Sequence, residues 1–252
     1  MPVTVGAIVP HAPVLALESG RLRPTSEVMR AAVESLTLDE CDVIVIASPH
    51  GRTSGVYSEI TGSLDGFGVH GRSVRAPSLT DLADELARQW KRPVIGPPAD
   101  HGIVGALLIA GRMVGPPLVA AAFRTITGPG APGSSEGAID EARSLAEAVT
   151  AISAARRVGF VASAHTSASL SSTAPLLDRP EGHELEERVL AALRRDPVEL
   201  AGIEHDLWRA AGACGAGPLT TFGLLFAGRP ADLIAYDTPV GIGYLVAQVL
   251  HS

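Results

Sequence analysis

The chain of 252 residues contains very little lysine and cysteine. Only Lys91 among its 20 basic residues is a lysine, and its place beside Arg92 and Pro93 predicts a surface position at a helix end. P-loop and Schiff-base chemistry each need a lysine and are therefore excluded, unless Lys91 itself serves. The two cysteines, Cys41 and Cys214, lie far apart, and we recognise no secretion signal. We therefore expect no disulfide framework and a reducing, cytoplasmic setting.

An excess of positive charge and a long unbroken hydrophobic run are also missing. The net charge is −7, from 20 basic and 27 acidic residues, so neither a nucleic-acid backbone nor an anionic membrane surface is the expected partner. Residues 210–228 are uncharged, but they contain five glycines and a proline, which favours a buried turn and helix over a membrane span. With 46% hydrophobic residues, the chain can build a sizeable core.

Short β-branched runs alternate with segments of helical periodicity, which predicts a layered α/β fold. The expected strands cover residues 3–9, 42–47, 69–74, 118–123, 157–162, 233–236 and 244–249. The expected helices cover residues 26–36, 79–90, 103–113, 136–154, 181–194 and 218–227. Segment 127–135, rich in glycine and proline, predicts a surface loop, because elements of unchanged composition follow it. We expect one domain over residues 1–252.

Four of the eight histidines stand where a predicted strand ends or a predicted helix begins. His11 and His50 follow the first two strands, His165 follows strand 157–162, and His101 precedes a helix. Open α/β sheets bind ligands at the carboxyl ends of their strands. A buried imidazole also needs a partner for each ring nitrogen, so filling the core does not explain these positions. We expect His11 and His50 to bind a metal together, and the pair suits Fe, Zn or Cu equally.

Asp100 and His101 stand at the predicted start of a helix. The positive end of the helix dipole lowers the pKa of an imidazole there, which favours a functional, neutral His101. In the alternative interpretation Asp100 caps the helix and His101 has no function. The remaining histidines are predicted on the surface or on helices, without a role. They are His70, His183, His205 and His251.

Other site chemistries lack their motifs. The sequence contains no GxSxG elbow, no HExxH zinc motif and no CxxC pair. The glycines of segment 128–133 have the spacing of a dinucleotide-binding loop, but prolines interrupt it and the next helix begins too late. A hydrolase that pairs Ser163 or Ser167 with His165 stays open as an alternative.

Several short motifs follow one another along almost the whole chain. They are PHAPVL at 10–15, SPHG at 48–51, DHG at 100–102, VASAHTSASL at 161–170, GHELEERVLAALRRDP at 182–197, CGAGPL at 214–219, AYDTP at 235–239 and GYLVA at 243–247. Their order resembles that in the catalytic B subunits of class III extradiol ring-cleavage dioxygenases and their Memo-like relatives. The resemblance implies a single three-layer αβα domain around a central mixed β-sheet, like that of these catalytic B subunits.

The resemblance also implies a mononuclear non-haem Fe(II) site that binds a catechol-like aromatic and O₂. His11 and His50 match the two histidine ligands of the family, and Cys214 matches the cysteine of the Memo-like segment, so it becomes the third ligand. A soft sulfur ligand keeps Zn or Cu open as alternative metals. The resemblance leaves open whether the chain forms a homo-oligomer or works with a small A subunit.

By the same resemblance, His101 matches the DHG histidine near the substrate. In the hypothesis that follows, His101 and His165 transfer protons, with Asp100 beside them as a further catalytic residue. The sequence departs from the family at two places. The acid/base histidine of the late turn is Ala168 here, with His165 three residues earlier, and the usual carboxylate ligand is absent from the C-terminal segment. A Memo-like metal- or redox-binding protein without ring cleavage is therefore the second hypothesis. A zinc-type hydrolase, the third, needs a carboxylate base that the sequence does not place.

Overall fold

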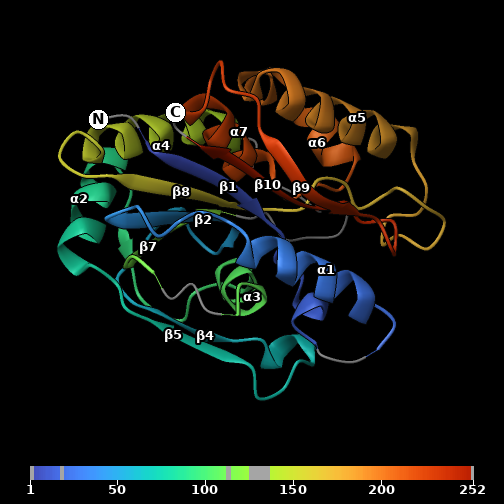
Figure 1. Cartoon of the computed structure of the whole chain (residues 1–252), viewed down its shortest axis with the longest axis horizontal. Coiled ribbons are helices and arrows are strands. Elements are labelled where there is room, and N and C mark those ends of the chain that lie inside the picture. The colour runs from blue at the N-terminus through green and yellow to red at the C-terminus, as the bar shows by residue number, and fades with distance from the viewer. Residues whose placement is uncertain (1–2, 18–19, 112–114, 125–136, 251–252) are drawn as a thin grey trace.

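The computed structural model describes residues 3–17, 20–111, 115–124 and 137–250, and its centre is an eight-stranded sheet (Figure 1). The strands are β1 Val5–Val9, β2 Val43–Gly51, β3 Gly55–Tyr57, β4 Ile60–Ser63, β5 Ser73–Ala76, β6 Val94–Ile95, β7 Leu118–Arg124, β8 Val158–Ser163, β9 Asp232–Asp237 and β10 Tyr244–Leu250. The α-helices are α1 Arg23–Glu34, α2 Thr80–Trp90, α3 His101–Ile109, α4 Ala138–Ile152, α5 Pro180–Arg195, α6 His205–Ala210 and α7 Ala216–Leu225. Short 3-10 helices cover Pro13–Ala16, Asp65–Phe67 and Pro197–Gly202.

The strand order of the central sheet is β6-β3-β7-β2-β8-β1-β10-β9, and β4 pairs with β5 in a separate hairpin. The four strands β7, β2, β8 and β1 are parallel neighbours. Strand β10 runs antiparallel to β1 and to β9, and β3 runs antiparallel to β7, so the sheet is mixed. Because β8 lies between β1 and β2, the carboxyl ends of these three strands meet at one edge.

Helices cover both faces of the sheet, as the predicted three-layer αβα arrangement requires. In β2, Val43 and Val45 pack into a core with α2, α4, α5 and α7, whereas Ile44 and Ile46 pack into a second core with α1 and α3. Alternate side chains of a strand point to opposite faces, so a strand buried on both faces is hydrophobic at every position. In Figure 1, α1, α3 and the β4–β5 hairpin lie below the sheet, and α4, α5 and α7 lie above it.

The predicted boundaries are wrong at several elements. Residues 69–72 form a turn, and β5 begins only at Ser73, because the hairpin pairs Ser73–Ala76 with Ile60–Ser63. Strand β2 continues to Gly51 instead of ending at residue 47, so His50 lies inside the strand. The sequence pattern also missed β3, β4, β6 and α6, each of them at most six residues long.

Other expectations are confirmed. Lys91 caps α2 in the left-handed conformation and is exposed, and both cysteines are free and buried. The uncharged stretch 210–228 forms a turn and the ten-residue helix α7. No helix among the described residues has both the length and the apolar character needed to cross a membrane. The predicted loop 127–135, the glycines of 128–133 and His251 lie outside the described residues.

Candidate metal centre

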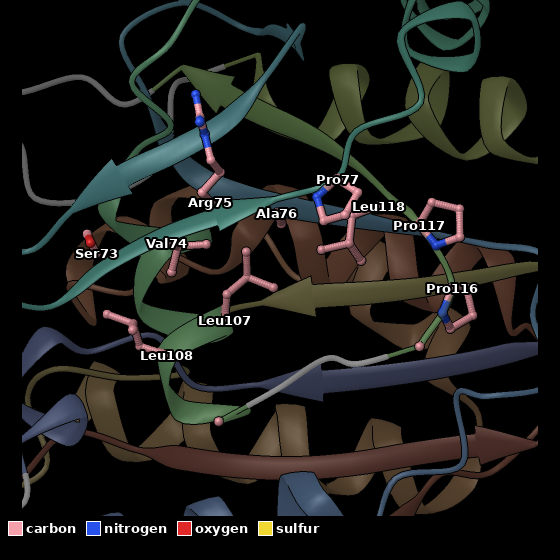
Figure 2. A pocket seen from close by; sticks show the side chains of 12 residues that line it. Ser73, Val74, Arg75, Ala76, Pro77, Leu107, Leu108, Pro116, Pro117 and Leu118 are labelled. Atoms are coloured by element: carbon pink, nitrogen blue, oxygen red, sulfur yellow. The ribbon is translucent and has the colours of Figure 1, made fainter.

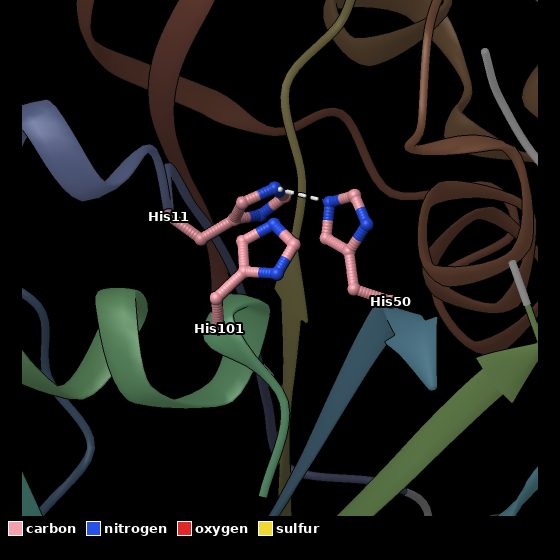
Figure 3. Close-up of side chains that lie close together, drawn as sticks. All are labelled: His11, His50 and His101. Carbon is pink, nitrogen blue, oxygen red and sulfur yellow. Dashed lines mark hydrogen bonds between the residues drawn. The ribbon is translucent and has the colours of Figure 1, made fainter. Parts of the chain in front are cut away.

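Four histidines and one cysteine come together at the edge where β1, β2 and β8 end. His11 and His165 each follow their strand by two residues, and His50 is the last residue but one of β2. His101 is the first residue of α3, and Cys214 lies in the turn before α7. Figure 3 shows the rings of His11, His50 and His101 facing one another. The expected convergence of strand-end histidines is therefore present in the fold.

His11 lies at the centre of the cluster. Its Nε2 is 3.0 Å from Nε2 of His50 and 3.6 Å from Sγ of Cys214. Two groups of side chains in the described residues could each hold a metal ion: His11, His50 and His101, or His11, His165 and Cys214. Within each group the ligand atoms lie within 4.8 Å of one another. The predicted set of His11, His50 and Cys214 takes members from both groups, and His11 belongs to each.

The spacing of His11 and His50 fits ligation of one ion. Two imidazole nitrogens bound to a tetrahedral zinc ion at about 2.1 Å are separated by about 3.4 Å, so the two nitrogens would move apart by only roughly 0.4 Å on binding it. The two rings are nearly perpendicular, with an interplanar angle of 85°, so they meet edge to face and are not stacked. The donor set of imidazole and thiol also suits Fe, Zn or Cu better than a hard cation such as Mg²⁺.

A serine at the end of β8 fixes the tautomer of His11. The Ser163 hydroxyl donates to the carbonyl oxygen of Gly102 at 2.7 Å, and its oxygen lies 3.0 Å from Nδ1 of His11. Because the hydroxyl proton points to Gly102, the serine oxygen accepts a proton from Nδ1, and Nε2 keeps its lone pair. The lone pair of Nε2 then faces His50 and Cys214, as a metal ligand requires.

Replacing Ser163 with alanine should weaken metal binding about 10- to 100-fold while the fold is retained, because Nδ1 loses the acceptor that orients the ring. Isothermal titration of the metal-free protein with Zn²⁺ measures the effect. Ser26→Ala serves as the matched control, since Ser26 is equally buried but donates only to the carbonyl oxygen of Leu22. Equal losses in the two variants would refute a special role for Ser163.

Asp100 acts as the cap of α3. Its Oδ1 accepts from the backbone N–H groups of Gly102 and Ile103 and from the Ser48 hydroxyl, and its Oδ2 accepts from the Tyr57 hydroxyl. The capping half of the alternative sequence interpretation is thus confirmed. The ring of His101 lies 3.9 Å from that of His50, and a function for His101 stays a prediction. These contacts give Asp100 a positioning role, and its direct part in proton transfer stays a prediction.

The turn before α7 brings Cys214 to His165. Gly212 adopts a φ of 65°, which glycine accepts without strain, and the chain then places Sγ of Cys214 3.1 Å from Nδ1 of His165. The tight turn predicted from the surrounding glycines is therefore present. Burial raises the pKa of the Cys214 thiol to about 12, so the thiol is protonated at neutral pH when no cation lies beside it.

Burial also keeps the imidazoles neutral. It lowers the pKa of His165 to about 4 and lowers the pKa of His11 and His50 well below the ordinary value, with a further contribution from neighbouring histidines. The pKa of His101 is lowered by burial too, against the opposing charge of Asp100. Neutral imidazoles are the form that binds metals and accepts protons.

Acid should destabilise the metal-free protein. Between pH 6.5 and 4 the histidines of the unfolded chain are protonated, whereas His165 of the folded chain stays neutral. The unfolded state therefore binds more protons, and the free energy of unfolding decreases as the pH is lowered. His165 alone should contribute about 1.4 kcal/mol per pH unit in this interval. Urea unfolding at pH 7, 6 and 5 measures the slope.

In that experiment His165→Gln should lower the slope of unfolding free energy against pH by about 1.4 kcal/mol per pH unit, which corresponds to one proton. His70→Gln is the matched control, because the His70 side chain is 81% exposed and lies outside the cluster. An unchanged slope in His165→Gln would show that His165 is not held neutral.

A cleft of about 650 Å³ opens beside the cluster, within the size range of small-molecule sites. His50 and His101 line one side, and Arg52, Phe67 and the segment 95–98 line the others. The Phe67 ring lies 4.5 Å from the His101 ring, and Phe67 is 53% exposed. An aromatic molecule could therefore rest against the histidines in this cleft.

A second cavity, of about 570 Å³, lies between the β4–β5 hairpin, the end of α3 and the start of β7 (Figure 2). Leu118 begins β7, so this cavity is at the amino edge of the parallel strands, opposite the histidines. Its charged lining residue, Arg75, pairs with Glu59 at 3.2 Å. It thus offers apolar surface but no free charge.

Sequence reasoning missed several supporting residues. Ser163 was considered only as a hydrolase nucleophile, and its bonds to His11 and Gly102 give it another role. Glu186 is buried on α5, and its Oε1 accepts from the hydroxyl of Thr166, the residue after His165. Burial raises the pKa of Glu186. The sequence around a helical glutamate does not indicate such a contact, because the contact arises only from the packing of α5.

No model of a known protein family matches the sequence, and no curated protein does. A solved structure is similar: an uncharacterized protein, JW3007, from Escherichia coli K12, with a TM-score of 0.64 and 19% sequence identity. The match covers 98% of this chain and 99% of that chain. At this identity the likeness supports the fold alone, namely a mixed sheet with helices on both faces.

Proposed function

We propose that the chain is a metal-dependent oxidoreductase of the class III extradiol type, with the fold of the catalytic B subunits, and that it cleaves the ring of a catechol-like aromatic with O₂. One observation carries the proposal: His11 and His50 face each other at 3.0 Å beside a cleft of about 650 Å³. His11, His50 and Cys214 would hold Fe(II). The bound metal would supply coordination of the catechol oxygens and of O₂ next to each other.

The residues of the chain would then position the aromatic ring and move its protons. His101 lies between the rings of His50 and Phe67, so it borders any molecule in the cleft. Because its pKa is lowered, its free nitrogen can accept a hydroxyl proton at neutral pH. His165, also neutral, borders the cluster on the side of Cys214 and offers a second proton acceptor.

A second function, a Memo-like metal- or redox-binding protein without ring cleavage, is favoured by the thiol. Cys214 is in contact with both His11 and His165, and neither candidate group in the described residues contains a carboxylate. A thiolate ligand suits Cu or Zn as well as Fe. Both functions share the metal site and differ in the reaction with O₂.

Metal analysis after anaerobic purification, followed by O₂ uptake on a panel of catechols, tests the two proposals. Iron bound in a 1:1 ratio with catechol-dependent O₂ uptake supports the dioxygenase. Bound metal without uptake supports the second function. Absence of any tightly bound transition metal after reconstitution would refute both.

His101→Ala should retain bound metal but lower kcat for the catechol about 100-fold or more, because a proton acceptor in the cleft is lost. Metal content and O₂ uptake are measured on the same sample. His205→Ala is the matched control, since His205 begins α6 and belongs to neither group of candidate ligands. Loss of metal in His101→Ala would instead make His101 a ligand, and the group of His11, His50 and His101 would hold the ion.

A further inference from the structure

We propose that Glu186 is a positioning residue, which acts through Thr166 to hold the ring of His165 against Cys214. The inference rests on the proposed function only in taking His165 and Cys214 as members of the site. The observation behind it is an acid on α5 that is buried yet forms no ion pair with another described residue.

The position of Glu186 in the core is unfavourable for a carboxyl group. Its neighbours on α5, Leu185 and Val189, belong to the apolar core between that helix and the sheet. Glu186 is 6% exposed, and burial raises its pKa. A carboxyl group is rarely buried without a partner of opposite charge, and an apolar side chain would avoid the penalty. The packing of α5 alone therefore does not explain an acid at this position.

The carboxyl group of Glu186 binds the turn that follows β8. Its Oε1 accepts from the Thr166 hydroxyl at 2.7 Å, whereas the carbonyl oxygen of Gly243 lies 3.2 Å from the same hydroxyl. A hydroxyl has one proton to donate, so the shorter contact, to Glu186, is the main hydrogen bond. The backbone of Gly243 completes the junction, because its carbonyl accepts from the Thr166 N–H at 3.1 Å and its N–H donates to the Ser167 carbonyl at 2.9 Å.

Three elements meet closely at this junction: α5, the turn after β8 and the start of β10. A Cβ atom at position 243 would lie 2.5 and 2.7 Å from the two carboxylate oxygens of Glu186, closer than such atoms can approach. The close approach of the backbone to the carboxyl group therefore requires glycine at this position. The contact between Glu186 and Thr166 is thus built from both sides.

The turn carries His165 next to Thr166. Residues 164–168 lie outside the strands, so the direction of the His165 ring depends on how this turn is held. Backbone hydrogen bonds hold its first and last residues, and the hydroxyl of Thr166 is the side-chain anchor of its middle. Sγ of Cys214 lies 3.1 Å from Nδ1 of His165. Loss of the anchor should let the ring move away from the thiol while the ends of the turn stay in place.

Alkylation of the full-length, metal-free protein by iodoacetamide at pH 8, followed at each cysteine by peptide mass spectrometry, tests the inference. Cys214 is 5% exposed, so its alkylation rate measures opening of the turn. Glu186→Met keeps the length of the side chain but removes the acceptor, and it should speed alkylation of Cys214 about tenfold. Thr166→Val should do the same, and the double variant should be no faster. Glu186→Gln retains an acceptor oxygen and should stay within about twofold of the wild type.

Cys41 is the internal control, because it is free, 6% exposed and precedes β2, at the opposite edge of the sheet. Its alkylation rate should change less than about twofold in every variant. Glu187→Met is the matched control variant, since Glu187 is the next residue of α5 and is exposed. Unchanged alkylation of Cys214 in Glu186→Met, equal acceleration at both cysteines, or Glu186→Gln as fast as Glu186→Met would each overturn the inference.

The iron-loaded protein separates this inference from the proposed function. If the wild type cleaves the ring, Glu186→Met should lower kcat about tenfold and change KM less than about twofold, because His165 moves protons and does not bind the ring. An equal kcat in the two proteins would overturn the positioning role. Faster alkylation of Cys214 in Glu186→Met, without ring cleavage by the wild type, leaves the inference standing and refutes the dioxygenase.

Discussion

Replacement of His11 by alanine should abolish stoichiometric metal binding, whichever side chains complete the site. His11 Nε2 belongs to both groups of candidate ligands, and Ser163 holds the ring so that this nitrogen faces the other ligands. Loss of a ligand from a three-ligand site removes most of the binding free energy, so occupancy should fall from one ion per chain to near zero. His50→Ala should have the same effect if His50 is a ligand, as proposed.

Metal content after dialysis against the free ion measures occupancy. His11 is 1% exposed, so alanine leaves a cavity, and His11→Gln provides a variant of more similar volume. Far-ultraviolet circular dichroism and thermal unfolding of the metal-free variants show whether the fold is kept. His183→Ala is the matched control, because His183 is exposed and pairs with Asp178 outside the cluster. Full occupancy in a folded His11 variant would contradict the proposed site.

The strands that could be predicted are those whose burial on both faces requires a continuous run of apolar residues. Strands β2 and β8 are covered on both faces, so residues 43–47 and 158–162 form apolar runs that are visible in the sequence. The hairpin strand β5 has no such signal, because two of its four residues are exposed and its register depends on pairing with β4. Strands of two to four residues, such as β3 and β6, exist only through their neighbours in the sheet.

The residues of the candidate site could be predicted from the sequence, but the contacts between them could not. His11 and His165 follow parallel strands and His50 lies near the end of a third one, and the geometry of such a sheet brings their positions to one edge. The order of these strands, with β8 between the other two, could not be derived from the sequence, and it is what places Ser163 against His11. Likewise, the contacts of Asp100 with Tyr57 and Ser48 join residues more than 40 positions apart.

Metal affinity should rise about tenfold per pH unit between pH 6.5 and 7.5, because binding releases one proton from Cys214. The thiol has a pKa of about 12 in the metal-free protein and is therefore protonated throughout this interval. It binds metal as the thiolate, so its proton must leave. The imidazoles contribute no proton, since burial lowers the pKa of His165 to about 4 and also lowers that of His11 and His50.

Competition with a chelator at several pH values, with Zn²⁺ as the probe, gives the affinity, and titration in buffers of different ionisation enthalpy counts the released protons. Cys214→Ser should bind zinc about tenfold or more weakly, with a slope near zero, because a serine hydroxyl keeps its proton. Cys41→Ser is the matched control: Cys41 is also free and buried, but it contacts Thr4 at 3.6 Å and should leave affinity and slope unchanged. If wild type and Cys214→Ser share one affinity and a slope of zero, Cys214 belongs to the core, and His101 becomes the third ligand beside His11 and His50.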